Sequence, residues 1–437
     1  MNRSRWAIAV AAWTLTACAE GARLEELADD GDVDHPSSTA GPGSPTSNAT
    51  GSGGGGGQAG AGGNGDSAQS GTGSSAPSTG SGGAPPAVSK IFAAPGGTCA
   101  IVAGEVRCWG QINVGIESAV AVAVPGLPTS DYVSMAMGRS HLCALDAVGV
   151  VRCWGSNLFG QLGNPATSSE GAIGEVIGLP PAVAVTAGER HTCAITVGGA
   201  LKCWGDNQDG ALGDHSHTNS PVPVDVANLS SGVLDVSAGS SFTCALLSGG
   251  ATECWGMNDG GLAGLGGNTP ADVLFPSEPV VGMASGVQAI SAGSIHACAI
   301  LASDGLECWG SFANGALGHV KDHTWGSLPG GVPGLGAGVS MVRAGYTLSC
   351  ALTTAGGVKC WGNNVYGQLG NGTTGGGWAP VDVVGLQSGV VDLAVGEAHA
   401  CALLADGRVR CWGLNIAGQL GDGTTTDSAI PVDVVGL

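Results

Sequence analysis

Cysteine is the residue type whose number and spacing in this chain most clearly imply chemistry. Fourteen of the fifteen cysteines form seven pairs, and in each pair the members lie nine or ten residues apart. The first member is always followed by Ala and the second by Trp-Gly. The spacing differs from the closely spaced Cys-x-x-Cys pairs of structural zinc sites, so it favours disulfides over a metal. The pairs are Cys99 with Cys108, Cys143 with Cys153, Cys193 with Cys203, Cys244 with Cys254, Cys298 with Cys308, Cys350 with Cys360, and Cys401 with Cys411.

Each pair flanks a tight turn, such as Gly198-Gly199, and therefore predicts two strands of a β-hairpin with the cysteines directly opposed. In the first pair the turn shortens to a loop around Ala103-Gly104, which keeps the register. A bridge across about ten residues stabilises the fold by roughly 2.5–3 kcal/mol in the chain-entropy description. Such bonds hold a hairpin together but do not link one hairpin to the next.

The fifteenth cysteine, Cys18, follows Arg3, Arg5 and an apolar run from Trp6 to Thr16 that is too short to span a bilayer. This arrangement predicts a secretory signal over residues 1–17. The sequence Leu15-Thr16-Ala17-Cys18 resembles the bacterial lipobox, in which the cysteine carries the lipid. The alternative is ordinary cleavage after Ala19 and secretion. Either route exports the chain to a compartment where disulfides persist, so we expect an extracytoplasmic location, anchored to the membrane through Cys18 in the first case.

Residues 18–88 have the composition of a tether. The stretch 20–34 is acidic, and 36–86 consists almost entirely of Gly, Ser, Ala, Thr and Pro. Such a segment lacks the apolar side chains that would offset the entropy of ordering, which predicts disorder.

The charge of the chain bears on its partners. From Ser89 onward there are 11 basic and 26 acidic residues, and the whole chain carries −20. A polyanion would be repelled. We therefore expect no nucleic acid partner, and contact with the membrane only through the N-terminal lipid.

Four histidines occupy the position two residues before a first cysteine: His141, His191, His296 and His399. A ring of imidazoles could serve a metal or catalysis. However, the other three copies have Gly97, Phe242 and Leu348 at this position, which favours packed, hydrogen-bonded histidines. No set of acid, base and nucleophile stands out from the repeat, so the sequence predicts neither an enzyme nor a cofactor or metal.

The repeated elements that position these residues are short strands. In the third copy, residues 183–188, 192–195, 200–204 and 221–226 are apolar or β-branched runs bounded by turn residues. Seven copies of about fifty residues, each with four strands, predict an all-β, seven-bladed β-propeller over residues 89–437. The seven repeated tryptophans are expected to pack between blades. If the blades are offset from the copies, the final strand, 431–437, would close the ring by pairing with the N-terminal strands.

After Trp-Gly the copies tend toward Asn-x-x-Gly-Gln-Leu-Gly, which is complete at 157–163, 364–370 and 415–421. Together with His-x-Cys-Ala-Leu this pattern resembles the regulator of chromosome condensation repeat. The resemblance implies a seven-bladed propeller and a binding role; members include nucleotide exchange factors for small GTPases and a bacterial β-lactamase inhibitor. Copy one departs from the pattern after Trp109, and copies four and five after Trp255 and Trp309, so less regular blades are expected there.

Residues that break the repeat are the candidates for recognition. The loops between the third and fourth strands should emerge on one face, and they carry His319, His323, Trp325 and Trp378. The alternative is that these tryptophans cover blade edges. We predict a monomeric propeller that binds an extracellular protein or glycan; the alternatives are a secreted hydrolase or lyase, or an inhibitor of an extracellular enzyme.

Overall fold

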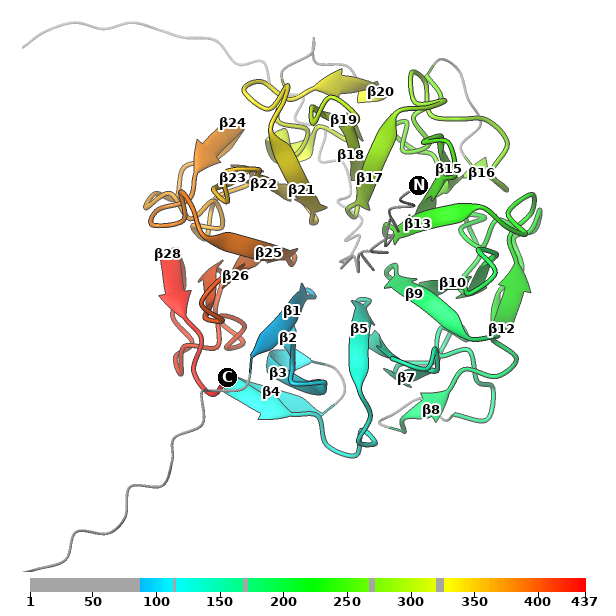
Figure 1. Ribbon diagram of the computed structural model, residues 1–437, viewed down its shortest axis with the longest axis horizontal. Coiled ribbons are helices and arrows are strands. Elements are labelled where there is room, and N and C mark those ends of the chain that lie inside the picture. The colour runs from blue at the N-terminus through cyan, green and yellow to red at the C-terminus, as the bar shows by residue number, and fades with distance from the viewer. Residues whose placement is uncertain (1–86, 113–114, 168–171, 267–271, 320–325) are drawn as a thin grey trace, which may run out of the picture. The chain divides into compact units, whose positions relative to one another are not determined.

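The computed structural model describes residues 87–437 except 113–114, 168–171, 267–271 and 320–325. Seven antiparallel sheets of four strands surround a central axis as blades 1 to 7, which confirms the predicted seven-bladed β-propeller (Figure 1). The expected signal peptide, Cys18 and the tether up to residue 86 lie outside the described residues.

In each blade the chain runs from strand A, nearest the axis, to strand D at the rim (Figure 1). The A strands are β1 (Val88–Ala93), β5 (Tyr132–Met137), β9 (Ala182–Ala187), β13 (Val233–Ala238), β17 (Val287–Ala292), β21 (Val339–Ala344) and β25 (Val390–Val395). The B strands are β2 (Gly97–Val102), β6 (His141–Asp146), β10 (His191–Thr196), β14 (Phe242–Leu247), β18 (His296–Leu301), β22 (Leu348–Thr353) and β26 (His399–Leu404).

The two outer positions of each blade vary more in length than the two inner ones. The C strands are β3 (Glu105–Ile112), β7 (Val151–Gly155), β11 (Leu201–Gly205), β15 (Thr252–Met257), β19 (Leu306–Gly310), β23 (Val358–Gly362) and β27 (Val409–Gly413). The D strands are β4 (Ile116–Ala123), β8 (Gly174–Glu175), β12 (Ser220–Asp225), β16 (Asp272–Val273), β20 (Gly326–Gly331), β24 (Gly377–Asp382) and β28 (Ser428–Asp433). A 3-10 turn, η1 (Ala313–Gly315), follows β19.

All seven predicted disulfides are present, and each joins strands B and C of one blade. Cys193 lies directly opposite Cys203 in the ladder, with the two Cα atoms 4.0 Å apart. In blade 1 the turn is Ala103-Gly104, both with positive φ, as the two-residue hairpin turn requires. The bridges are therefore local, and the blades must be held to one another by packing. In chain order, the bonds join Cys99 to Cys108, Cys143 to Cys153, Cys193 to Cys203, Cys244 to Cys254, Cys298 to Cys308, Cys350 to Cys360, and Cys401 to Cys411.

The seven repeated tryptophans supply that packing, because each is fully buried at the seam with the preceding blade. In six seams the indole N–H donates to a backbone carbonyl of the preceding blade's C–D loop, at 2.8–3.0 Å. The bonds run from Trp109 to Gln419, Trp204 to Gln161, Trp255 to Ala211, Trp309 to Leu262, Trp361 to Ala316, and Trp412 to Gln368. The exception is Trp154, whose buried Nε1 has no hydrogen-bond partner among the described residues.

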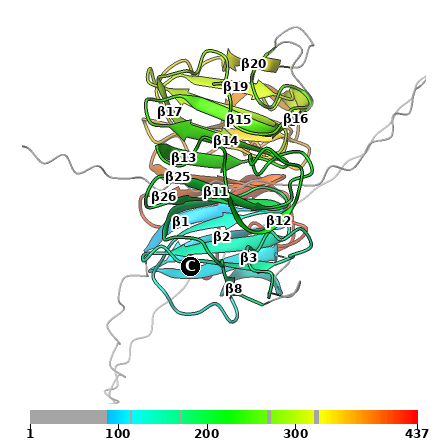
Figure 2. The ribbon, with the colours of Figure 1, turned by 90° about the vertical axis from the view of Figure 1, so that its right-hand side faces the viewer.

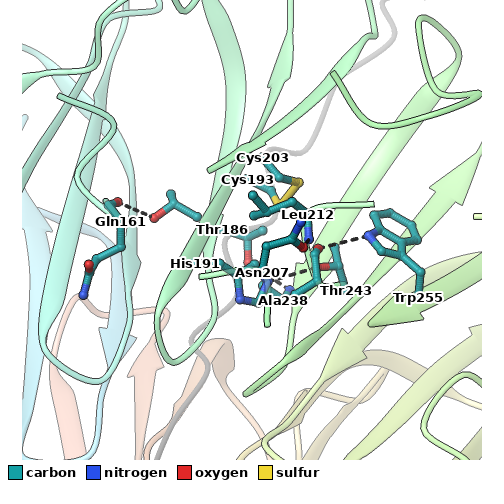
Figure 3. Close-up of a disulfide and its surroundings, with 12 residues drawn as sticks. Gln161, Thr186, His191, Cys193, Cys203, Asn207, Leu212, Ala238, Thr243 and Trp255 are labelled. Carbon is teal, nitrogen blue, oxygen red and sulfur yellow. Dashed lines mark hydrogen bonds between the residues drawn. A yellow bond between two sulfur atoms is a disulfide. The ribbon is translucent and has the colours of Figure 1, made fainter. Parts of the chain in front are cut away.

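The four repeated histidines join blades in the same seams, which confirms the prediction that they are packed and hydrogen-bonded. The Nε2 of His191 lies 3.0 Å from the Thr243 hydroxyl, which donates to the carbonyl of Ala211 (Figure 3). His141, His296 and His399 pair in the same way with Thr192, Ser349 and Thr98. Burial lowers the pKa of His141 to about 3 and the pKa of each of the other three to about 4, so all four are neutral at pH 7.

The ring closes between blades 7 and 1 through the same contacts that join the other blades. Here His399 pairs with Thr98 at 2.8 Å and Trp109 donates to Gln419 at 3.0 Å. Blades are not offset from copies, which was the condition for pairing of the last strand with N-terminal strands, because β25 to β28 form one sheet and β1 to β4 another. Each copy of the repeat is one complete blade, so no strand is exchanged. Closure uses side chains at the seam together with backbone bonds, such as that from the Ala121 N–H to the carbonyl of Val435 at 3.0 Å.

The predicted irregularities are confirmed in part. In copy one, β3 and β4 are eight residues long, in place of the Gly-Gln-Leu-Gly turn. In copy four, β16 is only two residues long, whereas β20 of copy five keeps six. Blade 2 also has a two-residue outer strand, β8, although its sequence motif is complete.

Candidate functional site

The order of strands gives the propeller two unlike faces. The A–B turns and the C–D loops lie at the same end of every blade, and we call this side the loop face. The B–C turns and the D–A connections lie on the opposite face; the edge-on view shows the strands running between the two (Figure 2). The predicted gathering of the C–D loops on one face is thereby confirmed.

Two of the four predicted recognition residues are described, and they belong to different blades. Trp378, at the start of β24, is 49% exposed and packs beside Gly315 of the preceding blade. His319 faces inward against Gly330, and its Nε2 lies 3.2 Å from the carbonyl of Cys308. Trp325 and His323 lie outside the described residues. Trp378 thus covers a blade boundary while half of it stays open to solvent.

The C–D loops are built around a buried asparagine. In blade 7, the Asn415 amide donates to Asp422 at 3.2 Å and to the carbonyls of Thr424 and Thr426. The Asp427 carboxylate accepts from the Asn415 backbone N–H at 2.7 Å. A side-chain amide therefore fills the centre of this ring of oxygens. Among the described residues, no three His, Cys, Asp or Glu side chains are grouped as a metal site requires.

Charged side chains of the A strands form a cluster near the axis. Arg343 lies 3.3 Å from the Asp392 carboxylate and donates to the carbonyl of Leu393 at 3.0 Å, while Asp392 accepts from the backbone N–H of Ile91 at 3.2 Å. These contacts link blades 6, 7 and 1. In blade 4, burial raises the pKa of Asp235 to about 7, and within the described part of the chain its Oδ2 has no hydrogen-bond partner.

The A–B turns place a second group of ionisable residues at the mouth of the ring on the loop face. The guanidinium of Arg139 lies 3.7 Å from the Glu189 carboxylate, which Arg190 also approaches to 3.2 Å. Glu397 and Tyr346 occupy the corresponding turn position in blades 7 and 6. Burial raises the pKa of Glu189 and of Glu397, and in both cases the Arg139 charge acts in the opposite direction.

Backbone hydrogen bonds between neighbouring A–B turns stiffen this mouth. Each bond runs from the N–H of one turn to a carbonyl of the turn in the next blade. The bonds run from Arg139 to Glu189, Glu189 to Ser240, Ser240 to Ser294, and Ser294 to Gly345, at 3.0–3.4 Å.

Outside the mouth, one position of the C–D loops is apolar in some blades and polar in others. The position after the loop asparagine is Leu158 in blade 2, Val365 in blade 6 and Ile416 in blade 7, with exposed fractions of 79%, 60% and 73%. We call these three residues and Tyr366 the apolar arc. Blades 3 and 4 have Gln208 and Asp259 at the same position. One residue of the apolar arc, Ile416, also lines a hollow of about 410 Å³ above blade 1.

Comparison with known proteins identifies the repeat. Models of the regulator of chromosome condensation (RCC1) repeat match residues 132–161, 182–211, 340–368 and 390–419, and a second model of that repeat matches 199–246 and 355–403. The solved structure of Prp20p from Saccharomyces cerevisiae has the same fold, with a TM-score of 0.66 at 20% identity over 80% of this chain and 86% of Prp20p. The chain contains RCC1 repeats.

Curated relatives match parts of this RCC1-repeat propeller. The ultraviolet-B receptor UVR8 of Arabidopsis thaliana is 28% identical over 314 residues, which are 70% of each chain. The E3 ubiquitin-protein ligase HERC2 of Homo sapiens is 35% identical over 209 residues, 47% of this chain but only 4% of HERC2. The likeness to HERC2 therefore concerns RCC1 repeats within a far longer protein.

Sequence reasoning missed the hydroxyl partners of the RCC1-repeat histidines, although a signal for them was present. Every copy with His before its first cysteine is followed by a copy with Thr or Ser directly before its own first cysteine, counting copy one after copy seven. The copies with Gly97, Phe242 and Leu348 are followed by Leu142, Ala297 and Ala400. Comparing neighbouring copies would have found the pairs.

The apolar arc was missed for a different reason. The motif Asn-x-x-Gly-Gln-Leu-Gly marks the RCC1 repeat by its constant positions, whereas the arc is made of its variable ones. Those positions differ around the face, and only a comparison between copies reveals them. No helix among the described residues is long and apolar enough to cross a bilayer.

Proposed function

We propose that this RCC1-repeat propeller is an exported, lipid-anchored protein that binds a partner protein through its loop face at the cell envelope. The observation that carries the proposal is the apolar arc. Three large aliphatic side chains at one repeat position are 60–79% exposed on a rigid face. Grouped exposed apolar side chains with a polar surround mark interaction sites.

Relatives support protein as the class of partner. The propeller architecture is that of a protein-interaction module, and two solved structures with a TM-score of 0.66 are of yeast RCC1, Prp20. One shows Kap60 bound to it, and the other concerns its binding to Gsp1p and histones. Those partners belong to Prp20. Their relevance here is that a propeller of this shape presents a face to other proteins.

Export and anchoring rest on the cysteines. Seven disulfides require an oxidising compartment to form and persist. Their pairing uses every cysteine except Cys18, which stands where a lipobox cysteine would stand. We therefore place the lipid on Cys18 and the propeller outside the cytoplasm, joined by the Gly- and Ser-rich segment.

A capture experiment tests the binding proposal. Envelope proteins are crosslinked to the full chain, to a Leu158→Asp/Val365→Asp variant, to a Trp378→Ala variant, and to a Val148→Asp/Val197→Asp control on the B–C turns. The control side chains are 75% and 70% exposed. We expect one partner to be captured by the wild type and the control and lost from the Leu158→Asp/Val365→Asp variant, with weaker capture by Trp378→Ala. Loss from the control variant alone contradicts the assignment of the face, and capture of glycan without protein contradicts the class of partner.

Anchoring has its own test. A Cys18→Ser chain should move from the membrane to the soluble fraction and lose incorporation of labelled fatty acid. Unchanged fractionation of this variant would contradict the anchor.

A further inference from the structure

The hollow above blade 1 exists because copy one lacks the turn that the regular copies have. In blades 2, 6 and 7 the chain after strand C folds back as Gly-Gln-Leu-Gly, and a carbonyl of this turn accepts the indole N–H of the next blade, as in Gln161 and Trp204. Blade 1 continues its C strand through Gln111 and Ile112 instead. Accordingly, Trp154 in blade 2 lacks a hydrogen-bond partner among the residues that the structure describes. The missing turn leaves about 410 Å³ between blades 7 and 2, within the range of ligand pockets, about 300–1,000 Å³.

The hollow has walls of mixed polarity, with apolar side chains on two sides. Ile416 and Leu414 of blade 7 form one side, and Pro95 and Ile112 of blade 1 line it below. Ile416 is 73% exposed although it borders a concave site. A large apolar side chain entering the hollow would remove Ile416 from water, which is the favourable part of such binding.

One carboxylate at the rim of the hollow, that of Glu397, shares the hollow with the guanidinium of Arg139. Glu397 lines the hollow and is half-buried, and its pKa is raised by burial, with Arg139 alone opposing that rise. Arg139 forms its ion pair with Glu189. Among the described residues no hydrogen bond or ion pair involves the Glu397 side chain. An incoming cation would satisfy this carboxylate, and the net charge of −20 favours a basic partner.

We propose that the hollow above blade 1 is the anchor pocket of the loop face, and that it takes a protein segment in which a lysine or arginine lies next to a large aliphatic or aromatic side chain. The apolar side chain enters between Ile416 and Ile112, and the cation meets Glu397. This inference rests on the proposed function, since it names the chemistry of the partner that the loop face would bind.

Selection from a phage-displayed library of random twelve-residue peptides tests the pocket. The bait is the full chain with Cys18→Ser, oxidised. We expect enriched peptides to carry Lys or Arg within two residues of Leu, Ile, Phe or Met. Their binding should weaken at least tenfold with Ile416→Asp and with Glu397→Lys, and stay unchanged with Ile416→Val and with Val197→Asp. Unaltered thermal unfolding of each variant controls for folding.

The outcomes separate this inference from the proposed function. Enriched peptides without a basic residue, or peptides indifferent to Ile416→Asp, overturn the pocket. If the peptides are instead lost with Leu158→Asp/Val365→Asp, the loop face still binds protein and only the pocket is wrong. No enrichment above the unselected library also overturns the pocket, whereas the capture experiment with envelope proteins decides the proposed function independently.

Discussion

The seams between blades and the loop face differ in which residues of the repeat they use. The seams are built from residues that recur in the copies: the indole of strand C, the histidine of strand B and its hydroxyl partner. The apolar arc uses positions that vary, with Leu158, Val365 and Ile416 on one side of the ring and Gln208 and Asp259 on the other. The recurring residues are therefore the ones that hold neighbouring blades together. The variable positions of the loop face are the ones that we propose for recognition of a partner.

Blade 1 joins the two regions, because one departure from the repeat affects both. Among the described residues, the missing turn leaves Trp154 without the hydrogen bond that the other six indoles make, and it opens the hollow on the loop face. A buried donor without a partner costs on the order of 1–3 kcal/mol. We infer that this seam is less stable than the others.

The largest contrast should be between two tryptophans. Trp204→Ala removes a fully buried indole from a seam, so we expect a loss of about 3–5 kcal/mol in the free energy of unfolding. Trp378→Ala removes a half-exposed side chain and should cost less than about 1 kcal/mol. Denaturant titration of both variants measures the difference. Equal losses would show that the repeated indoles do not hold the seams.

Removing one disulfide should have the next largest effect. A variant with both Cys193→Ser and Cys203→Ser loses a cross-strand bridge that closes a loop of ten residues, and we expect a loss of about 2.5–3 kcal/mol. Binding by the loop face should persist, since the bridge lies within a single hairpin. Unchanged stability, with the other six bridges intact by non-reducing mass mapping, would contradict the prediction.

Acid should weaken the seams through the histidines. Each has a folded pKa of about 3 or 4 against 6.5 in the unfolded chain, so its stabilising contribution is complete above pH 6.5 and is lost as the pH falls toward 4. The double substitution His191→Phe/Thr243→Ala replaces the polar pair of one seam by an apolar pair. Phe242 and Ala297 already form such a pair in another seam of the chain. This variant should lose less stability between pH 6.5 and 4 than the wild type, by on the order of 1–3 kcal/mol.

A second buried group, Asp235, changes the stability of both proteins with pH in the opposite direction to the histidines. Its folded pKa of about 7 lies above 3.8, so its contribution to stability is present at low pH and lost as the pH rises toward 7. Because Asp235 is present in both proteins, its effect cancels in the difference. Identical pH profiles for the wild type and the His191→Phe/Thr243→Ala variant would contradict the role given to the histidines.

The smallest predicted effect is a difference in stability between substitutions at two buried tryptophans. Trp204→Phe loses the hydrogen bond to Gln161, whereas Trp154→Phe loses none, because the Trp154 N–H has no partner in the described ranges of the chain. We expect the Trp204→Phe variant to be less stable than the Trp154→Phe variant by about 1 kcal/mol. A difference of opposite sign in the unfolding midpoints would show that the Trp154 N–H is satisfied in solution.

The blades were predictable from the sequence because they repeat. The strands of the third copy were predicted to within two residues at each end, and all seven disulfides followed from the spacing of the cysteines and the turn between them. The mode of ring closure could not be predicted, since the position of the blade boundary relative to the repeat depends on packing between copies. A single copy does not contain that information.

Most of the candidate site was not predictable, because it joins positions from several copies. Arg139, Glu189 and Glu397 meet only where their A–B turns converge at the mouth, and the hollow appears only where blade 1 lies between two regular neighbours. Trp378 was selected because it is an aromatic residue outside the repeat, and its side chain is half-exposed on the loop face. His319, selected on the same ground, packs inward because its ring fills the space beside Gly330.

Site-specific photo-crosslinking in the intact cell envelope tests most directly the claim that recognition lies on the loop face. A photoreactive amino acid is placed at position 416 in one strain and at position 197, on the opposite face, in another. We expect a discrete protein adduct from position 416 and none from position 197. An adduct from position 197 alone, or the same adduct from both positions, would contradict the account.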